Sequence, residues 1–580
     1  MYLDSTYASS DQDKANLFNK FFFSVYSQMT TQPSLAGHSH SNSSLSSINI
    51  TISDVFDALS SLDPSKAMGI DCIGPKVLKN CATALCTPVH HLFSVSLSTG
   101  RLLNKWRTHL ITPIFKAGDK CSVKNCRPIS LLCTISKVLE CLVFNHVADF
   151  LADHMSVSQF GFLKGRSSQQ QLLIMLNEVH ANTRGKLCTD VVYLDFRKAF
   201  DSVSHSILLS KLQLMGITGL LLNWFRAYLD SRSQLVSVNG QHSCLLPVTS
   251  GVPQGSILGP LLFLVYINDL PGYVHFSRPL LFADDTKCLS SVSVDSSPNL
   301  QLDLNSLSQW SIVNCIGFNE AKSVVLRFPH GAVPPSYFIN GKEIPVVKLH
   351  RDLGVLLSRD LSWSDHICLI SSKAYKMLGL IRRTFSSTVS VSVRKLLYLT
   401  LVRSRLLYCS VVWRPYLQKD IVQLEKVQRR ATKFILNDFN SDYKTRLISL
   451  GLLPLSMVLE LNDIVFFLKS LQSPSASFNI LDYISFSTSS TCSASKLKLI
   501  HSFSAKNSSY HFYFNRLPRL WNRLPVVDPN TSLSSAISQI KRFLWLHFTS
   551  NFNPSDPCSY HLVCPCHKCL STSSSCNFLS

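Results

Sequence analysis

Residues 280–287 read Leu-Leu-Phe-Ala-Asp-Asp-Thr-Lys, an apolar run followed by two adjacent acids and a return to polar sequence. A second apolar run, Val191-Val192-Tyr193-Leu194, ends directly at Asp195. Each pattern is typical of a short buried strand. Two such strands would bring carboxylates to one end of a sheet, where they could hold divalent cations. A lone Asp-Asp pair is more often an ordinary turn, so the surrounding sequence decides between the two interpretations.

A shaped loop lies between these acids. Residues 250–260 read Ser-Gly-Val-Pro-Gln-Gly-Ser-Ile-Leu-Gly-Pro, with three glycines and two prolines. Such a composition indicates a loop whose backbone approaches another group closely. A Gly-rich loop alone says little about nucleotide binding, but this one is flanked by Asp195 and Asp284.

Transfer of a nucleotidyl group needs two cations about 4 Å apart, which activate the attacking hydroxyl and stabilise the leaving pyrophosphate. Mg²⁺ is commonly held by one or two carboxylates together with substrate phosphates. We expect Asp195 and Asp284 to bridge two Mg²⁺ ions, for which Mn²⁺ could substitute. Asp285 is expected to be the third metal-binding and catalytic acid.

Three segments resemble motifs A, B and C of reverse transcriptases, in particular those of jockey-like, LINE-type non-LTR retrotransposons. They are Asp195–Asp201, the Gly-Val-Pro-Gln-Gly-Ser loop at 251–256, and Phe282–Asp285. Further resemblances to the same group follow in the same order along most of the chain, at 114–119, 125–132, 159–162, 165–167, 318–323, 353–355 and 521–525.

The resemblance implies an α+β fold, the right-hand polymerase with fingers, palm and thumb, followed by a helical C-terminal extension. Strands are expected near 109–115, 190–195, 233–238, 279–283 and 323–328. The expected regions are an N-terminal helical segment (1–33), a Ser-rich linker (34–49), an N-terminal extension of the fingers (50–96), fingers and palm (97–362), a basic helical thumb (363–470), a second Ser-rich linker (471–509) and a C-terminal segment with a Cys-rich tail (510–580).

The resemblance also assigns roles to side chains around the three acids. Phe200 would be a steric gate that occupies the space of a ribose 2′-hydroxyl; the alternative is a core aromatic at the start of a helix. Lys322 would protonate the departing pyrophosphate, unless it is an ordinary surface lysine. The remaining nucleotide-binding candidates are Lys116 and Arg127 for the triphosphate, Phe196, and Gln254, Gly255 and Ser256 beside the nascent base pair.

Charge supports a polyanionic partner. The chain has 56 Lys and Arg against 35 Asp and Glu, and 16 of the basic residues against four acidic ones lie between Lys373 and Arg446. A basic region of this size attracts polyanions and makes their binding salt-dependent. On the expected helix around 421–434, Ile421, Leu424, Val427, Ala431 and Phe434 form an apolar stripe, while the basic residues largely face elsewhere.

The 19 cysteines are scattered and odd in number, which fits reduced thiols better than a disulfide framework. A denser cluster near the C-terminus contains Cys558, Cys564, Cys566 and Cys569. Its spacing matches no standard zinc finger. A small Zn²⁺ site and a loose Ser-rich tail both remain open here.

The expected activity is RNA-directed DNA synthesis, with an RNA template, a DNA primer or target and dNTPs as partners. No membrane partner is expected, and the resemblance implies an intracellular ribonucleoprotein of cytoplasm and nucleus. The endonuclease that such elements usually carry has no counterpart in this sequence. Two alternatives remain: an RNA-templated RNA polymerase, and a catalytically decayed remnant that only binds RNA. The sequence gives no indication of oligomeric state.

Overall fold

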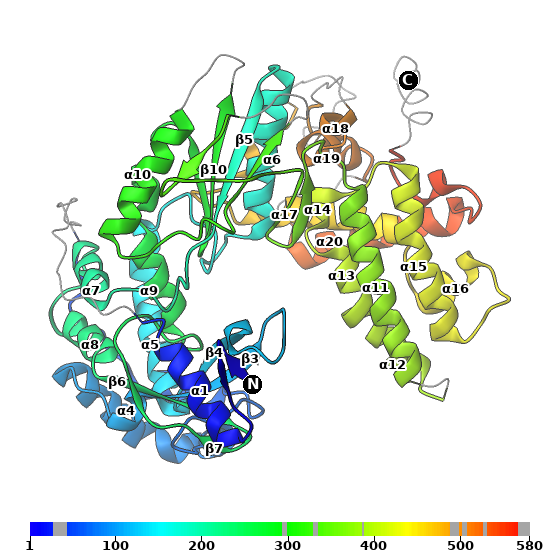
Figure 1. Ribbon diagram of the computed structural model, residues 1–580. Coiled ribbons are helices and arrows are strands. Elements are labelled where there is room, and N and C mark those ends of the chain that lie inside the picture. Colours follow the sequence, from blue (N-terminus) through cyan, green and yellow to red (C-terminus); the bar gives the residue numbers. More distant parts are fainter. Residues whose placement is uncertain are drawn as a thin grey trace.

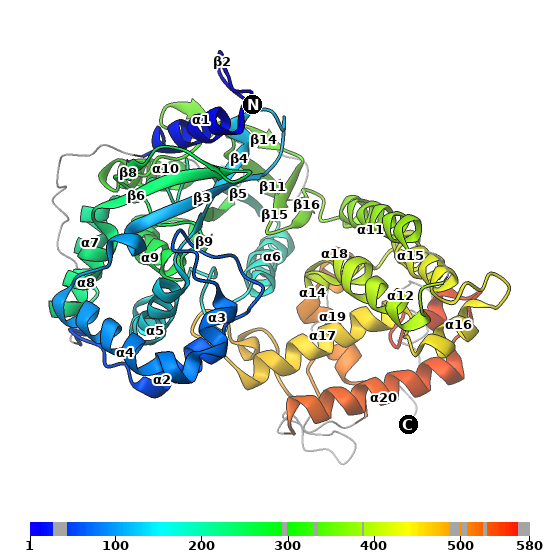
Figure 2. The ribbon, with the colours of Figure 1, turned by 90° about the horizontal axis from the view of Figure 1, so that it is seen from below.

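The computed structural model describes residues 1–26, 43–292, 299–328, 335–385, 388–487, 498–501, 507–525 and 531–565. Two bodies lie side by side (Figures 1 and 2), one of mixed sheet and helix and one almost wholly helical. The mixed body contains the chain up to about residue 362, and the helical body contains the rest. The chain is therefore of mixed α and β structure, as the sequence predicts.

The central sheet of the mixed body has five strands in the order β14-β11-β5-β10-β9. Strand β5 runs antiparallel to both β10 and β11, and β10 is antiparallel to β9. The bounds are Cys188–Leu194 for β5, Arg278–Phe282 for β9, Asp285–Val292 for β10, Val324–Phe328 for β11 and Val346–Val347 for β14. The strands expected near 190–195, 279–283 and 323–328 are confirmed.

Both faces of this sheet are covered, because successive side chains of a strand point to opposite sides. Val191 and Tyr193 of β5 share a core with α6 (Ser168–Arg184) and the helical body. Val192 and Leu194 share a second core with helices on the other face. Those helices are α5 (Thr134–Leu151), α7 (His205–Leu214), α8 (Gly219–Leu229), α9 (Leu258–Ile267) and α10 (Asn299–Val313).

A second sheet lies below the first in Figure 1, with the order β4-β3-β6-β7 and β8 paired to β6. Its strands are β3 (Thr108–Phe115), β4 (Cys126–Leu131), β6 (Arg232–Val238), β7 (Gln241–His242) and β8 (Leu246–Val248). Helix α1 (Asp11–Phe23), which the sequence predicts, packs Phe18 and Phe22 against Ile111 and Val236 of this sheet. The strands expected near 109–115 and 233–238 are also confirmed.

Three N-terminal helices complete the mixed body beside α5 and α8. They are α2 (Ile52–Ser60), α3 (Pro75–Asn80) and α4 (Ala82–Thr99). Short two-stranded ribbons are formed by β1 (Tyr2–Leu3) with β2 (Thr6–Tyr7), by β12 (Phe338–Ile339) with β13 (Lys342–Glu343), and by β15 (Leu349–Asp352) with β16 (Val355–Ser358).

The helical body forms one continuous core with the adjacent face of the central sheet. Ile421, Leu424, Val427 and Ala431 are buried in it, so the predicted apolar stripe is confirmed. Its helices are α11 (Ser364–Thr384), α12 (Val391–Leu397), α13 (Ser404–Leu407), α14 (Ser410–Trp413), α15 (Gln418–Leu436), α16 (Tyr443–Leu450), α17 (Leu455–Gln472), α18 (Asn507–Tyr510), α19 (Tyr513–Trp521) and α20 (Leu533–Asn551).

The predicted boundary at residue 470 does not separate two packing units. Helix α17 packs against both α19 and α20, and residues as late as Tyr560 and Leu562 share its core. The sequence suggests a boundary because residues 485–509 are rich in serine. The apolar residues that follow nevertheless return to the same core.

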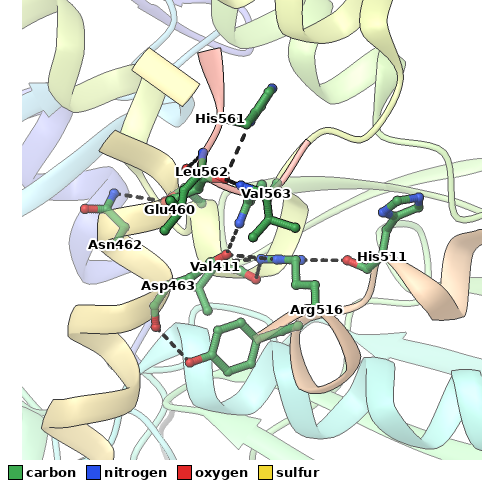
Figure 3. A network of polar contacts seen from close by, with 12 residues as sticks. Val411, Glu460, Asn462, Asp463, His511, Arg516, His561, Leu562 and Val563 are labelled. Carbon is green, nitrogen blue, oxygen red and sulfur yellow. Dashed lines mark hydrogen bonds and ion pairs between the residues drawn. The ribbon is translucent and has the colours of Figure 1, made fainter. Parts of the chain in front are cut away.

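A buried ionic network joins α14, α17, α19 and the segment around 561 (Figure 3). The carboxylate of Asp463 accepts two hydrogen bonds from Arg516, each 2.9 Å long, and one from Arg414 at 2.8 Å. Glu460 accepts from Arg414 at 2.8 Å and from the backbone N–H of Leu562 at 2.8 Å. Because both carboxylates are fully buried, these partners replace the hydrogen bonds that water would otherwise donate.

Among the described residues, no single helix has the length and apolar composition needed to cross a membrane. Of the helices that the structure describes, α16 and α17 meet that test as a pair, and their axes are bent by 48° at the break between them.

Candidate active site

The strand register brings Asp195 beside the Asp284–Asp285 pair. Leu194, the last residue of β5, pairs with Thr286 of β10, so Asp195 leaves the sheet next to the turn between β9 and β10. Residues directly opposite in an antiparallel pair have Cβ atoms about 5 Å apart. The two acidic segments, far apart in the sequence, therefore meet at one end of the central sheet.

The turn that carries Asp284 has a strained backbone and is held from behind. Ala283 has a φ of +53°, which is uncommon for a residue with a Cβ atom. The side-chain oxygen of Gln159 accepts hydrogen bonds from the N–H groups of Gly161 at 2.8 Å and Ala283 at 2.9 Å. A Cβ atom on Gly161 would lie only 2.4 Å from the nitrogen of Ala283. Glycine at 161 thus permits the contact that positions this turn.

Gln159 and Gly161 belong to the 159–162 segment that resembles the family, but the sequence alone assigns no role to either residue. The feature that could have drawn attention to them is a glutamine two residues before a glycine, in a stretch with no regular apolar pattern. Nothing in the sequence says which distant backbone that glutamine binds, because the partner at residue 283 is known only from the fold.

The acids of the site repel one another. Burial raises the pKa of Asp284, and the neighbouring Asp195 raises it further. Burial also raises the pKa of Asp285 to about 6, with additional repulsion from Asp284 and Asp352. Within the described part of the chain, the buried Oδ2 of Asp195 accepts no hydrogen bond, and Lys322 Nζ lies 3.4 Å from it. Carboxylates arranged in this way gain stability from a cation between them.

Two basic side chains approach these acids from the second sheet. Lys116 and Arg127 are exposed near the end of the β3–β4 hairpin, where Ile114 pairs with Arg127. Both lower the pKa of Asp284, which places them within electrostatic range of that carboxylate. The pKa of Lys116 is lowered, chiefly by burial and then by Arg127, while Asp195 and Asp284 act in the opposite direction. The structure therefore brings the predicted triphosphate-binding pair towards the predicted metal-binding pair.

The 250–256 loop is fixed through its backbone to the segment that follows β5 and to strand β4. Gly251 N donates to Val203 O at 2.7 Å, and Val252 N donates to Phe200 O at 2.8 Å. The N–H of Ser130 in β4 donates to Gln254 O at 2.8 Å. Gly255 is exposed, and its φ of +129° places it where a Cβ atom would meet Ser130 O at 2.5 Å. The loop therefore bridges the two regions that carry the acids and the basic pair.

Asp201 is a site residue that sequence reasoning missed. Its Oδ1 accepts a hydrogen bond of 2.8 Å from Gln254 Nε2, and its backbone oxygen accepts one from Ser250. Burial raises the pKa of Asp201 to about 6, and the hydrogen bond from Gln254 opposes that shift. Asp201 ends the 195–201 segment, where an acid near a helix start is easily taken for a cap.

Two predicted nucleotide contacts need correction. The ring of Phe196 is buried and stacks on Phe318, with centroids 4.7 Å apart, so this side chain packs in the core. The hydroxyl of Ser256 is turned inwards, where it donates to Pro253 O at 3.0 Å and accepts from Gly259 N at 2.8 Å. It stabilises the start of α9 and does not face the loop's outer side. Phe196 and Ser256 therefore hold the site in place through packing and capping.

Phe200 lies beside the 250–256 loop, where its backbone oxygen accepts from Val252 N, and its ring has a packing partner. Its half-buried ring stacks on Phe263 of α9, with centroids 4.6 Å apart and planes inclined by 20°. Both roles are compatible, since one face of the ring can pack while an edge borders the site. The gate assignment stays a prediction.

The turn at Leu353-Gly354, in the 353–355 segment that resembles the same family, joins β15 to β16 and contacts the helical body. Tyr408 donates a hydrogen bond of 2.9 Å to Leu353 O, and Gly354 has a φ of +86° close to the Tyr408 ring. Asp352, just before this turn, is buried against Lys287 of β10. The turn is thus tied both to the sheet that carries the acids and to the helical body.

Among the described residues, no group of three or more His, Cys, Asp or Glu side chains is arranged to hold a metal ion. Asp195 and Asp284 would supply two ligands, and the remaining positions would fall to substrate and water. Of the predicted zinc ligands, Cys558 and Cys564 are half-buried near the end of the described chain, whereas Cys566 and Cys569 lie outside the described residues.

Comparison with known proteins agrees with this geometry. Residues 114–381 match the family model described as "Reverse transcriptase (RNA-dependent DNA polymerase)". That range contains the end of the β3–β4 hairpin with Lys116 and Arg127, all three acids and the 250–256 loop, and it ends within α11.

Similar curated proteins come from mobile elements of Drosophila melanogaster. The chain is 26% identical over 403 residues to "Probable RNA-directed DNA polymerase from transposon BS", covering 67% of this chain and 44% of that protein. It is 28% identical over 331 residues to "RNA-directed DNA polymerase from mobile element jockey", covering 55% and 36% respectively. It is 28% identical over 386 residues to "Probable RNA-directed DNA polymerase from transposon X-element", covering 64% of this chain and 42% of that protein.

The chain thus spans less than half the length of each of these relatives. Within that span, the matched motifs and the converging acids lie in the same domain. Residues 114–381 of the chain thus match a reverse transcriptase domain, and the chain is similar to the RNA-directed DNA polymerases of jockey and related mobile elements.

Proposed function

We propose that this protein synthesises DNA on an RNA template from dNTPs, by nucleotidyl transfer that depends on two divalent cations. The observation that carries the proposal is the convergence of Asp195 and Asp284 at one sheet end, with Lys116 and Arg127 within electrostatic range of Asp284. Opposing carboxylates and basic side chains leave between them a place suited to a metal-bound triphosphate. In this proposal the central sheet is the palm, the β3–β4 hairpin belongs to the fingers, and the helical body contains the thumb.

Asp195 and Asp284 would hold the Mg²⁺ ions, with Asp285 as the nearby third acid. The fit rests on the buried Oδ2 of Asp195, which accepts no hydrogen bond among the described residues, and on the raised pKa of Asp284. When bound, Mg²⁺ would promote attack by the primer hydroxyl and neutralise charge on the phosphates.

The remaining roles belong to the chain's own side chains. Lys116 and Arg127 would bind the triphosphate, Arg127 through its planar fork and Lys116 as a point charge. Lys322, which lies 3.4 Å from Asp195, would give a proton to the departing pyrophosphate. Gln254 and Gly255 would border the nascent base pair, and Phe200 would exclude the 2′-hydroxyl of a ribonucleotide.

The duplex product would lie across the palm and the basic helical body, bound through its backbone and shape. By similarity to mobile-element polymerases, we further propose that a nicked DNA end primes synthesis on the element's own RNA. The protein would then work in a ribonucleoprotein of cytoplasm and nucleus.

Primer extension tests the proposal. The full chain is incubated with oligo(dG) on poly(rC), Mg²⁺, and either dGTP or GTP, and the products are resolved by length. We expect extension with dGTP, at least 100-fold less with Asp284→Asn, and none in the presence of chelator. The matched control is Asp149→Asn, which removes the same charge from an exposed position on α5.

Each other outcome supports a different function. Equal use of dGTP and GTP would favour an RNA-templated RNA polymerase. Binding of poly(rC) without extension would favour a decayed RNA-binding remnant. The gate prediction is tested separately, because Phe200→Ala should raise incorporation of GTP relative to dGTP; unchanged discrimination would remove Phe200 from that role.

A further inference from the structure

A groove lies at the end of the helical body, between the last turns of α11 and α15 and the start of α12. It has a volume of about 480 Å³, and four basic side chains line it: Arg382, Arg394, Arg430 and Lys433. No Asp or Glu is among its described lining residues. A groove with this composition favours an anionic ligand.

The acidic residues of this region are few, and each is held by hydrogen bonds within the fold. Asp420 is buried and accepts from Ser364, and Glu425 is buried against Tyr443 and the N–H of Leu455. Asp438 accepts from two backbone N–H groups of the following turn, and Asp442 caps α16. All four acids between 373 and 446 therefore serve the fold, whereas the sixteen Lys and Arg residues there exceed what these acids can neutralise.

Aromatic rings alternate with the basic side chains in this groove. Phe439 is 62% exposed, and Phe385 and Phe434 are half-buried beside it. Arg394 is buried and donates a hydrogen bond of 2.8 Å to the backbone carbonyl of Phe434, which fixes the wall of the groove. Exposed rings next to phosphate-binding cations are typical of surfaces on which unpaired bases stack.

The groove is distant from the acids of the active site. The starts of α11 and α15 meet at the Ser364–Asp420 hydrogen bond of 2.8 Å, and the groove lies at their other ends. Arg382 is eighteen residues along α11 from Ser364, which corresponds to about 27 Å of helix. Figures 1 and 2 show α12 at this outer tip, away from the central sheet. A ligand here would not occupy the place of the reacting nucleotide.

We propose that this groove binds single-stranded nucleic acid, with phosphates on Arg382, Arg430 and Lys433 and an unpaired base on Phe439. A duplex fits less well, because its bases are stacked on each other and cannot present a face to Phe439. Single-stranded RNA and single-stranded DNA both carry phosphates and unpaired bases, so either could bind in this groove. The site goes beyond the proposed polymerase reaction and does not depend on its chemistry.

Fluorescence anisotropy of the full chain tests this proposal. The probes are a labelled 20-nucleotide oligo(U), the corresponding oligo(dT), and a blunt RNA–DNA duplex of the same length. Phe439→Ala should weaken binding of a single strand about five-fold or more and leave duplex binding unchanged. Comparison of the affinities for oligo(U) and oligo(dT) shows whether the groove prefers RNA or DNA.

The basic side chains are tested by salt dependence. Arg430→Ala combined with Lys433→Ala should lower the slope of log K against log salt by about 1.4 for a single strand, since each lost phosphate contact accounts for about 0.7. The matched control is Lys419→Ala combined with Lys426→Ala, which removes two exposed lysines from the same helix outside the groove. This control should retain most of the slope.

Two results would overturn the proposal. One is single-strand binding by Phe439→Ala equal to that of the unmodified chain, and the other is an equal loss of slope in the two double variants. The Asp284→Asn variant separates this test from that of the polymerase. It should bind oligo(U) normally while failing to extend a primer, so one proposal can fail while the other stands.

Discussion

Substitution of Gly161 by alanine should damage catalysis far more than stability. The added Cβ atom would lie 2.4 Å from Ala283 N, and ordinary van der Waals contact begins at about 3.4 Å, so the turn must move by the difference, about 1 Å. Gln159 binds the same N–H group, which limits how the turn can yield. Asp284 is the next residue and moves with it.

A displacement of about 1 Å in a reacting group costs on the order of 100-fold in rate. We therefore expect Gly161→Ala to lower kcat for dGTP incorporation on oligo(dG)–poly(rC) about 100-fold. Overpacking of this size costs about 1–3 kcal/mol in unfolding free energy, which urea denaturation would measure. The protein should thus remain folded at the assay temperature.

The matched control is Gly272→Ala, because a Cβ atom there meets no atom within 4 Å and the backbone is not left-handed. It should keep the rate and stability of the unmodified chain. If Gly161→Ala retained kcat within about three-fold, the contact between 161 and 283 would not position Asp284. The proposed coupling between this glycine and the metal-binding acid would then be wrong.

Three further predictions concern charge and hydrogen bonding. The pKa of Asp285 is about 6 in the folded protein, above its usual value of 3.8, so the protonated carboxyl stabilises the fold below about pH 4 and this stabilisation is lost as the pH rises through 6. In the presence of chelator, Asp285→Asn should therefore raise Tm at pH 8 but not at pH 4. Equal gains in Tm at both pH values would refute this. Arg516→Met deprives buried Asp463 of two hydrogen bonds and should cost about 3–5 kcal/mol in urea unfolding, whereas a loss below about 1 kcal/mol would contradict the network's importance. Asp201→Ala should lower kcat/KM for dGTP about ten-fold by freeing Gln254, while Asp201→Asn, which keeps an oxygen there, should lose less than three-fold; equal losses would count against this hydrogen bond.

Much of the active site follows from local patterns in the sequence. The apolar runs before Asp195 and Asp284 predict strands, and the structure confirms β5 and β9 there. The glycines of the 250–256 loop correctly indicate close backbone approach, as at Gly255 beside Ser130. These signals are local, because strand burial and turn conformation depend on residues near one another in the chain.

Other features could not be predicted because their partners are distant in sequence. The ring of Phe196 is buried against Phe318, and Asp201 meets Gln254, only once the chain has folded. The boundary expected near residue 470 was wrong for the same kind of reason. A Ser-rich stretch interrupts the pattern, but the helices after it return to the core of α17.

The sequence alone determined which residues could do chemistry: acids at strand ends, a Gly-rich loop between them, and a basic helical region after them. Only the tertiary structure decided which of these meet. It placed Gln159 behind the Ala283 turn, brought Lys116 and Arg127 towards Asp284, and gathered Phe439 with the basic side chains in one groove. The physical reason is that strand periodicity and turn chemistry act over a few residues, whereas register and packing are settled by contacts among segments throughout the fold.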